Sequence, residues 1–395
     1  MSRKRLFQFS IPVLVIALLI TGWSTYSSGS NLQSQSQPKT SASDQPTGDL
    51  TPSSSPSPPP AEVKMAEPSP TTPPQGETLP AAEHQEPAGA EPATRVSSQL
   101  NPEPPPNEPQ SVIYSIRQTF EIRNQEPVDG SSLEITVAKI RTIDPFQEVT
   151  SFSVEPDLEY REKSDEHGNQ YLVFELKDLP TQEKIRLSLN YEVIVHAQAI
   201  QSQDCEGDLI AEYTQPEQYI ESDSPEISAL VEKLSRDTTN ACEQSRLFYD
   251  YVTRTLAYSG HTRESRGALH ALIYKAGDCT EFADLLIALN RSAGIPARFV
   301  EGVTPLGSDE AHDWAQVYLP GSGWTAMDPT WGRKSENREI YFAGTTPDHI
   351  IVTTGRNLEA LNGFHYWTYS YTCPKISAHQ DVNISMDWDI KKVGD

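Results

Sequence analysis

The chain has 395 residues, enough for two ordinary domains and a long segment besides. Its 31 Lys and Arg against 55 Asp and Glu give a formal net charge of −24 at pH 7, which argues against nucleic acid and anionic lipid head groups as partners. An apolar fraction of only 36% and a count of 32 prolines indicate that part of the chain does not pack into a core.

The N-terminus combines a basic cluster with an apolar run. Arg3, Lys4 and Arg5 precede the run, which covers residues 6–23 and is long enough to span a bilayer. No A-x-A cleavage site or lipoprotein-type cysteine follows it. We therefore expect residues 1–23 to be a signal anchor that leaves the head of a single-pass cell-membrane protein on the extracytoplasmic side. A cleaved signal peptide, which would make the protein secreted, is the alternative.

Residues 24–110 consist mainly of Ser, Thr, Pro, Gln, Glu and Ala, with few large apolar side chains. Proline triplets at 58–60 and 104–106 favour extended polyproline II backbone. Such a segment cannot bury enough apolar surface to offset the entropy that ordering would cost. We expect a disordered, Pro-rich stalk between the membrane and a folded head, so that the membrane is contacted only through the N-terminal segment.

Short strand-like segments separated by turn formers follow the stalk. Apolar residues in them alternate or run together with β-branched and aromatic types, and no helical stretch interrupts them. This spacing predicts a small all-β sandwich over residues 111–204, with a structural or adhesive role. The expected strands cover residues 112–122, 132–140, 147–154, 171–176 and 185–195.

Beyond residue 204 the apolar pattern takes a helical period. Ser224 and Pro225 form an N-cap and first-turn proline for one helix, which continues to Leu234. Asp278 and Glu281 have the spacing of a capping box at the start of another. Two helices are expected between them, over residues 241–256 and 267–275.

The last of these helices ends at Gly294 and Pro296, and strands are expected after it. A Pro-Gly-Ser-Gly turn joins two of them into a hairpin, and we assign residues 205–395 to one catalytic domain that includes C-terminal strands. The expected strands and extended stretches cover residues 298–303, 312–319, 324–328, 338–354, 364–371 and 382–393.

Three residues in this region have the chemistry of a thiol enzyme. Cys279 would be the first residue of the capped helix, where unpaired N–H groups and the positive dipole end stabilise a thiolate. His312 opens one strand of the hairpin and can accept the thiol proton. Asp328 closes the next strand and can orient the imidazole. In a regular hairpin closed by Leu319 and Trp324 this pair would be about three residues out of register, so we expect a bulge or irregular turn.

Each residue also has a plainer interpretation. A cysteine on an apolar helix is usually an unreactive side chain packed in the core. The sequence Asp328-Pro-Thr is also typical of a turn after a strand. A Cys/His/Asp zinc site is a further alternative, but only three ligands are visible and none is closely spaced. We expect neither a metal nor a cofactor.

Four sequence blocks together resemble the bacterial transglutaminase-like superfamily. The resemblance covers about residues 205–355, with all three catalytic blocks in family order and at similar spacing. The preceding strands also resemble the β-sandwich that often comes before this domain. The blocks are Gly277-Asp-Cys-Thr-Glu-Phe-Ala283, Leu289-Asn-Arg-Ser-Ala-Gly-Ile-Pro-Ala-Arg298, His312-Asp-Trp-Ala-Gln-Val-Tyr-Leu-Pro320 and Gly323-Trp-Thr-Ala-Met-Asp-Pro-Thr330.

The resemblance implies an α+β fold with a papain-like transglutaminase core, helices packed on an antiparallel sheet. It implies that Cys279 is the nucleophile, His312 the base and Asp328 its orienting acid. One departure is Asp313, where many relatives have a small residue. An extra carboxylate there would raise the pKa of the imidazole or alter the choice of substrate.

The implied activity is a Cys acyl-enzyme reaction on protein or peptide amide bonds. Hydrolysis would make the protein a cysteine peptidase or amidase, and aminolysis would make it a protein-glutamine acyltransferase. We expect hydrolysis first, because nothing in the sequence marks an amine site, and an extracytoplasmic protein or cell-wall peptide as substrate. A catalytically silent surface binding or adhesion module is the alternative function.

The other three cysteines are an odd number for an oxidising compartment. A Cys205–Cys373 bridge would tie the start of the catalytic domain to the C-terminal strands, and a Cys205–Cys242 bridge is the rival pairing.

Overall fold

The computed structural model describes residues 110–124, 131–179, 184–199, 205–262, 264–305, 311–363, 368–373 and 382–394. No helix within these ranges has both the length and the apolar character needed to cross a membrane. The expected anchor and all but the last residue of the expected stalk lie outside the described residues, so both stay predictions.

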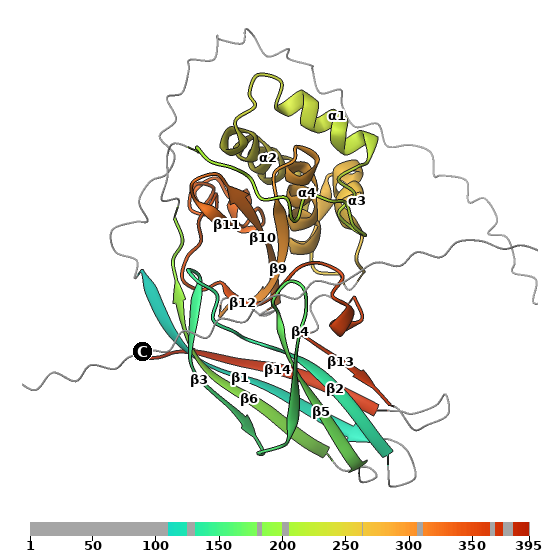
Figure 1. Ribbon diagram of the computed structural model, residues 1–395. Helices are drawn as coiled ribbons and strands as arrows, with labels where there is room; N and C mark the ends of the chain where they lie inside the picture. The colour runs from blue at the N-terminus through green and yellow to red at the C-terminus, as the bar shows by residue number, and fades with distance from the viewer. Residues whose placement is uncertain are drawn as a thin grey trace, which may run out of the picture. The chain divides into compact units, whose positions relative to one another are not determined.

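Eight strands form two four-stranded antiparallel sheets, which we call the two-sheet unit (Figure 1). One sheet has the order β14-β1-β6-β3 and the other the order β13-β2-β5-β4. The strands are β1 (Ser111–Asn124), β2 (Ser131–Lys139), β3 (Gln147–Glu155), β4 (Tyr160–Ser164), β5 (Gln170–Leu179), β6 (Lys184–His196), β13 (Tyr369–Thr372) and β14 (Val382–Lys392).

The two sheets share one hydrophobic core, to which β1 contributes every second residue. In β1 the buried positions alternate with exposed or half-buried ones, and Ile116 and Phe120 lie in the core. Phe120 meets Tyr369 of the other sheet edge to face, with ring centroids 5.2 Å apart. The alternation read from the sequence is thus the pattern that builds this core.

The C-terminal strands belong to the two-sheet unit, which corrects the expected assignment of residues 205–395 to one domain. Strand β14 pairs along β1 from Tyr114↔Lys392 to Asn124↔Val382, and β13 pairs with β2. A strand as long as β1 needs its open edge covered, and β14 covers it. The alternating pattern of residues 382–393 predicts a strand but does not identify the partner strand.

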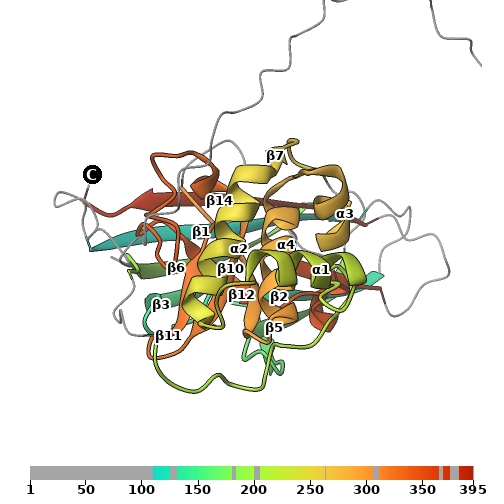
Figure 2. The ribbon, with the colours of Figure 1, turned by 90° about the horizontal axis from the view of Figure 1, so that it is seen from above.

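Four helices lie between the two halves of the two-sheet unit in sequence, at the positions expected. The Ser224 side chain caps α1 by accepting from the N–H of Ile227, and the capping box of Asp278 and Glu281 is formed at α4. Figures 1 and 2 show α4 among the other helices, against β9 and β10. The helices are α1 (Pro225–Leu234), α2 (Ala241–Thr255), α3 (Gly267–Tyr274) and α4 (Cys279–Ser292).

A third antiparallel sheet, of order β11-β10-β9-β12, packs against α4. The expected extended stretch 338–354 is only partly a strand, because residues 338–349 run through turns and a single bridge before β12 begins. The remaining elements are β7 (Ala257–Tyr258), β8 (Ala276–Gly277), β9 (Ala297–Val303), β10 (Ala311–Leu319), β11 (Gly323–Met327), β12 (Ile350–Thr354) and the 3-10 helices Trp331–Arg333 and Glu359–Leu361.

Strand β12 lies next to the two-sheet unit (Figure 1), and two side-chain amides of that unit bind its outer edge. The Gln147 amide accepts from the N–H of Ile351 at 2.8 Å and donates to its carbonyl at 2.9 Å. The Asn169 amide accepts from the N–H of Thr354 at 2.9 Å and donates to its carbonyl at 2.7 Å. Both amides are buried. They therefore satisfy backbone groups of β12 that a neighbouring strand would otherwise pair with, and they connect the third sheet to the two-sheet unit.

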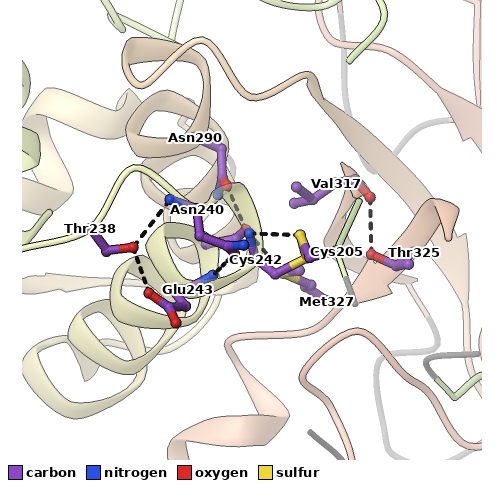
Figure 3. Close-up of a disulfide and its surroundings, with 10 residues drawn as sticks. Cys205, Thr238, Asn240, Cys242, Glu243, Asn290, Val317, Thr325 and Met327 are labelled. Carbon is purple, nitrogen blue, oxygen red and sulfur yellow. Dashed lines mark hydrogen bonds between the residues drawn. A yellow bond between two sulfur atoms is a disulfide. The ribbon is translucent and has the colours of Figure 1, made fainter. Parts of the chain in front are cut away.

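The disulfide joins Cys205 to Cys242, which makes the expected Cys205–Cys373 bridge wrong (Figure 3). Cys242 lies in the first turn of α2, and its N–H donates to the sulfur of Cys205 at 3.2 Å. Cys373 follows β13 in the two-sheet unit and is a half-buried free thiol. The bridge therefore pins the segment that enters the helical region to α2.

We predict that Asn169→Ala lowers the free energy of unfolding by about 2–4 kcal/mol, because it leaves the buried N–H and carbonyl of Thr354 unsatisfied. Urea denaturation measures the change. Asn190→Ala removes an exposed hydrogen bond to Arg117 and should cost less than about 0.5 kcal/mol. Equal losses in the two variants would contradict the role of Asn169 as a substitute for a strand.

Replacing both Cys205 and Cys242 by Ser should destabilise the chain by about 4 kcal/mol, since the bridge closes a loop with a sequence separation of 37. Peptide mapping of unreduced protein should find this bridge and leave Cys373 alkylatable. A bridge to Cys373 would refute the pairing.

Candidate active site

Cys279 is the first residue of α4 and is 5% exposed. It takes part in no disulfide. The preceding Asp278 caps the helix by accepting from the N–H of Thr280 at 3.0 Å, and its other oxygen accepts from the N–H of Thr262 at 2.8 Å. The sulfur is therefore held at the positive end of the helix dipole by a cap that is itself fixed on two sides.

The first turn of α4 is also anchored through Glu281. Its carboxylate accepts from the N–H of Asp278 at 3.0 Å and forms a close ion pair with Arg266. Burial raises the pKa of Glu281, while Arg266 acts in the opposite direction. The loop before α3 thus helps to fix the position of Cys279.

His312 and Asp328 lie side by side in a buried environment. The Nε2 atom of His312 is 2.8 Å from Oδ2 of Asp328, and Oδ1 accepts from the N–H groups of Thr330 at 2.8 Å and Trp331 at 3.0 Å. Burial alone would raise the pKa of Asp328, but the neighbouring histidines lower it to well below its usual value. An ionised Asp328 accepts a hydrogen bond from the N–H at Nε2 of His312, which leaves Nδ1 free to take a proton from a thiol.

The register of the β10–β11 hairpin brings His312 and Asp328 together without a bulge. The expected bulge or irregular turn is therefore wrong. Strands β10 and β11 pair regularly, with Leu319 opposite Gly323 and Ala315 opposite Met327. Continuing that register places Asp328 opposite Trp314, two positions from His312 on the same face. Diagonal neighbours at this offset are within reach of long side chains.

A hydrogen bond between the residues that follow Cys279 and His312 joins the two elements. The hydroxyl of Thr280 donates to Oδ2 of Asp313 at 2.7 Å, and both side chains are fully buried. This bond brings the start of α4 against the start of β10.

Burial, followed by repulsion from Glu301, raises the pKa of Asp313 well above the usual value. The structure pairs this carboxyl group with the hydroxyl of Thr280, and its expected effect on the imidazole or on the choice of substrate stays a prediction.

Aromatic rings enclose the histidine. Trp331 stacks on His312 with centroids 5.0 Å apart, and Trp314 lies at 5.9 Å. Gly302 is opposite His312 in β9, where an added Cβ would come within 2.3 Å of the Trp314 ring. These rings restrict the orientation of the imidazole and exclude water from it.

A second histidine, His349, was missed in the sequence. It is 4% exposed, and its Nε2 atom lies 3.3 Å from Oδ2 of Asp328 while Nδ1 lies 2.8 Å from Oδ1 of Asp348. The only signal was an Asp-His pair directly before the apolar run of β12. The sequence predicts an extended stretch over residues 338–354, and nothing in that pattern relates position 349 to position 328.

One group of side chains in the described ranges has the spacing of a metal site: His312, Asp328 and His349, whose ligand atoms lie within 4.8 Å of one another. Ligands of a tetrahedral zinc ion, each ~2.0–2.1 Å from the metal, are about 3.3 Å apart. The 2.8 Å contact between His312 and Asp328 is that of a direct hydrogen bond. We therefore assign the group to the histidine–carboxylate arrangement.

A polar cavity of about 770 Å³ lies at the other end of β12, lined by residues that include Asp165, Glu217 and Arg356. Cys279, His312 and Asp328 are absent from its lining. The cavity is therefore separate from the candidate active site.

Comparisons with known proteins agree with this geometry. Residues 228–329 match the family model of the transglutaminase-like superfamily. The uncharacterized protein YebA of Bacillus subtilis (strain 168) is 30% identical over 146 residues, which make up 31% of this chain and 20% of that protein. The protein-glutamine gamma-glutamyltransferase of Pseudomonas aeruginosa is 34% identical over 68 residues, 14% of this chain and 10% of that protein. The chain thus spans a fifth or less of these two relatives.

A crystal structure from Cytophaga hutchinsonii, described as that of a cysteine protease candidate, matches with a TM-score of 0.53 at 19% identity. The match covers 72% of this chain and 92% of that chain, and at this identity it shows the fold alone. Residues 228–329 thus match the transglutaminase-like superfamily, and the fold combines helices with antiparallel sheets.

We predict that Asp313→Asn changes the pH dependence of stability. A carboxyl whose folded-state pKa is raised contributes stability that is complete below its unfolded pKa of about 3.9 and is lost as pH rises through the folded-state pKa. Relative to wild type, the amide variant should gain about 1 kcal/mol or more between pH 4.5 and pH 8. Urea midpoints across this range measure the difference. A constant or opposite difference would show that Asp313 is ionised in the fold.

Proposed function

We propose that the protein is an extracytoplasmic transglutaminase-like thiol enzyme that acts on protein or peptide amide bonds through an acyl-enzyme on Cys279. The observation that carries the proposal is the hydrogen bond from His312 to the ionised, buried Asp328, next to the helix that begins with Cys279. A binding module does not require a histidine oriented by a buried carboxylate on a strand that is hydrogen-bonded to the start of this helix.

In the proposed reaction the Cys279 thiol loses its proton to Nδ1 of His312, and the thiolate attacks the amide carbonyl carbon. When the tetrahedral intermediate collapses, the C–N bond breaks and the amine leaves with the proton from His312. A thioester remains on Cys279. Water, deprotonated by His312, then attacks the thioester, releases the carboxylic acid and restores the thiol.

Hydrolysis is the first choice over transfer to an amine. A primary amine in place of water would turn the same thioester into a cross-link, as the name of the Pseudomonas relative indicates for that protein. No feature of the described residues identifies an amine site. A peptidase or amidase is therefore proposed, with the protein-glutamine acyltransferase reaction as its variant.

The location outside the cytoplasm is supported by two features. One is the basic and apolar N-terminal segment, and the other is the Cys205–Cys242 bridge, since disulfides persist in oxidising compartments. An extracytoplasmic protein or a cell-wall peptide is the substrate class proposed for an enzyme so placed.

The pH dependence of alkylation by iodoacetamide tests the proposal, with Cys373 as an internal control. Burial raises the pKa of the Cys373 thiol, so this residue should react slowly below neutral pH. We expect Cys279 to react rapidly at pH 6, and His312→Ala to slow it about 100-fold, because an ordinary thiol with a pKa of about 8.5 is less than 1% ionised there. Mass spectrometry of the two peptides measures both rates.

Slow alkylation of Cys279 that is indifferent to His312 would refute the enzyme and favour the alternative, a catalytically silent surface binding or adhesion module. Rapid alkylation in both wild type and His312→Ala would show an accessible thiol without a histidine base, and would also count against the proposed mechanism.

A further inference from the structure

Asp328 is shared between two histidines. Both Nε2 atoms point to the same oxygen, Oδ2, at 2.8 Å from His312 and 3.3 Å from His349. Since the carboxylate can only accept, each histidine presents an N–H to it. A second histidine on the orienting acid is more than the mechanism described above requires.

His349 is also bound on its other side. Nδ1 lies 2.8 Å from Oδ1 of Asp348, and that oxygen accepts from the hydroxyl of Thr346 at 2.6 Å. A histidine with an acceptor at each nitrogen carries a proton on both, because the neutral ring has only one N–H. Burial lowers the pKa of His349, but the hydrogen bonds to Asp328 and Asp348 outweigh burial and raise it to about 9.

The other groups around His349 leave this charge in place. The titratable groups that face it in the described ranges are Asp348, Asp328 and His312, and the Tyr341 ring, whose centroid lies 5.7 Å away. The rings of Trp314 and Trp331 lie edge to face with it, at 5.0 and 4.7 Å. Two carboxylates and a shell of aromatic rings thus enclose one buried cation.

We propose that His349 is a positioning residue for the cysteine chemistry: as a cation between Asp348 and Asp328, it fixes the Asp328 carboxylate and sets the pH range in which His312 works. The inference rests on the proposed function. The His312–Asp328 pair is thereby part of a longer series of hydrogen-bond contacts, His312–Asp328–His349–Asp348.

The cation acts through charge as well as position. The centroids of the His312 and His349 rings are 5.8 Å apart, so a cation on His349 lies close to the imidazole that is to accept the thiol proton. Loss of this positive charge should therefore move the pH profile of Cys279 alkylation to higher pH.

The position of His349 depends on the two-sheet unit. His349 directly precedes β12, whose outer edge is bound by Gln147 at Ile351 and by Asn169 at Thr354. The amides therefore hold the strand that places the histidine against Asp328. This gives the two-sheet unit a part in the active site although it contributes no group to the chemistry.

The test compares the full chain with His349→Gln and Asp348→Asn. Glutamine keeps one hydrogen bond but carries no charge, so the profile of Cys279 alkylation against pH should move up by about one unit. Asp348→Asn removes one of the two carboxylates that stabilise the charge on His349. The alkylation profile of this variant should therefore move in the same direction by a smaller amount. His196→Gln, whose ring contacts Ser111 in the two-sheet unit, should leave the profile unchanged. Urea midpoints identify variants that do not fold.

Nitrogen NMR of the wild-type protein labelled at histidine reports on the charge directly. Two protonated nitrogens on His349 at pH 7.5 support the proposal, and a neutral ring overturns it. Rapid alkylation of wild-type Cys279 with an unshifted profile in His349→Gln also overturns it and leaves the proposed function intact. Slow alkylation of the wild type overturns the proposed function and this inference with it.

Discussion

The structure of the candidate active site depends on one fully buried carboxylate. Asp328 has no exposed surface, and an unpaired charge there would cost several kcal/mol. Four donors balance it: the N–H groups of Thr330 and Trp331 and the rings of His312 and His349. These donors come from three parts of the chain, so their hydrogen bonds to Asp328 also fix the segment after β11, the start of β10 and the approach to β12.

The two-sheet unit supports the candidate active site through the edge of β12. Strand β12 is the edge of the third sheet and would present unpaired backbone groups on its outer side. Gln147 and Asn169 pair with those groups, and the C-terminal chain then returns as β13 and β14 to complete the two sheets. The transglutaminase-like domain is thereby inserted into the two-sheet unit in sequence and hydrogen-bonded to it in space.

Local signals in the sequence predicted local structure well. The capping pattern at Asp278 and the proline at position 225 place α4 and α1, and alternation predicts most strands. Features that join distant positions were not predictable. The disulfide partner of Cys205, the pairing of β14 with β1 and the contact between His349 and Asp328 depend on tertiary packing, which no periodicity encodes. Asp313 was visible in the sequence, but its raised pKa follows from burial and from repulsion by Glu301, which only the fold shows.

The most direct measurement is to trap the acyl-enzyme. The chain would be mixed with an activated acyl ester, quenched with acid and analysed by peptide mass spectrometry. The account predicts one acyl group on Cys279 that hydroxylamine removes, none on the free thiol of Cys373, and none on Cys279 in Asp328→Ala. Acylation of both cysteines to the same extent, or of Cys279 regardless of Asp328, would contradict it.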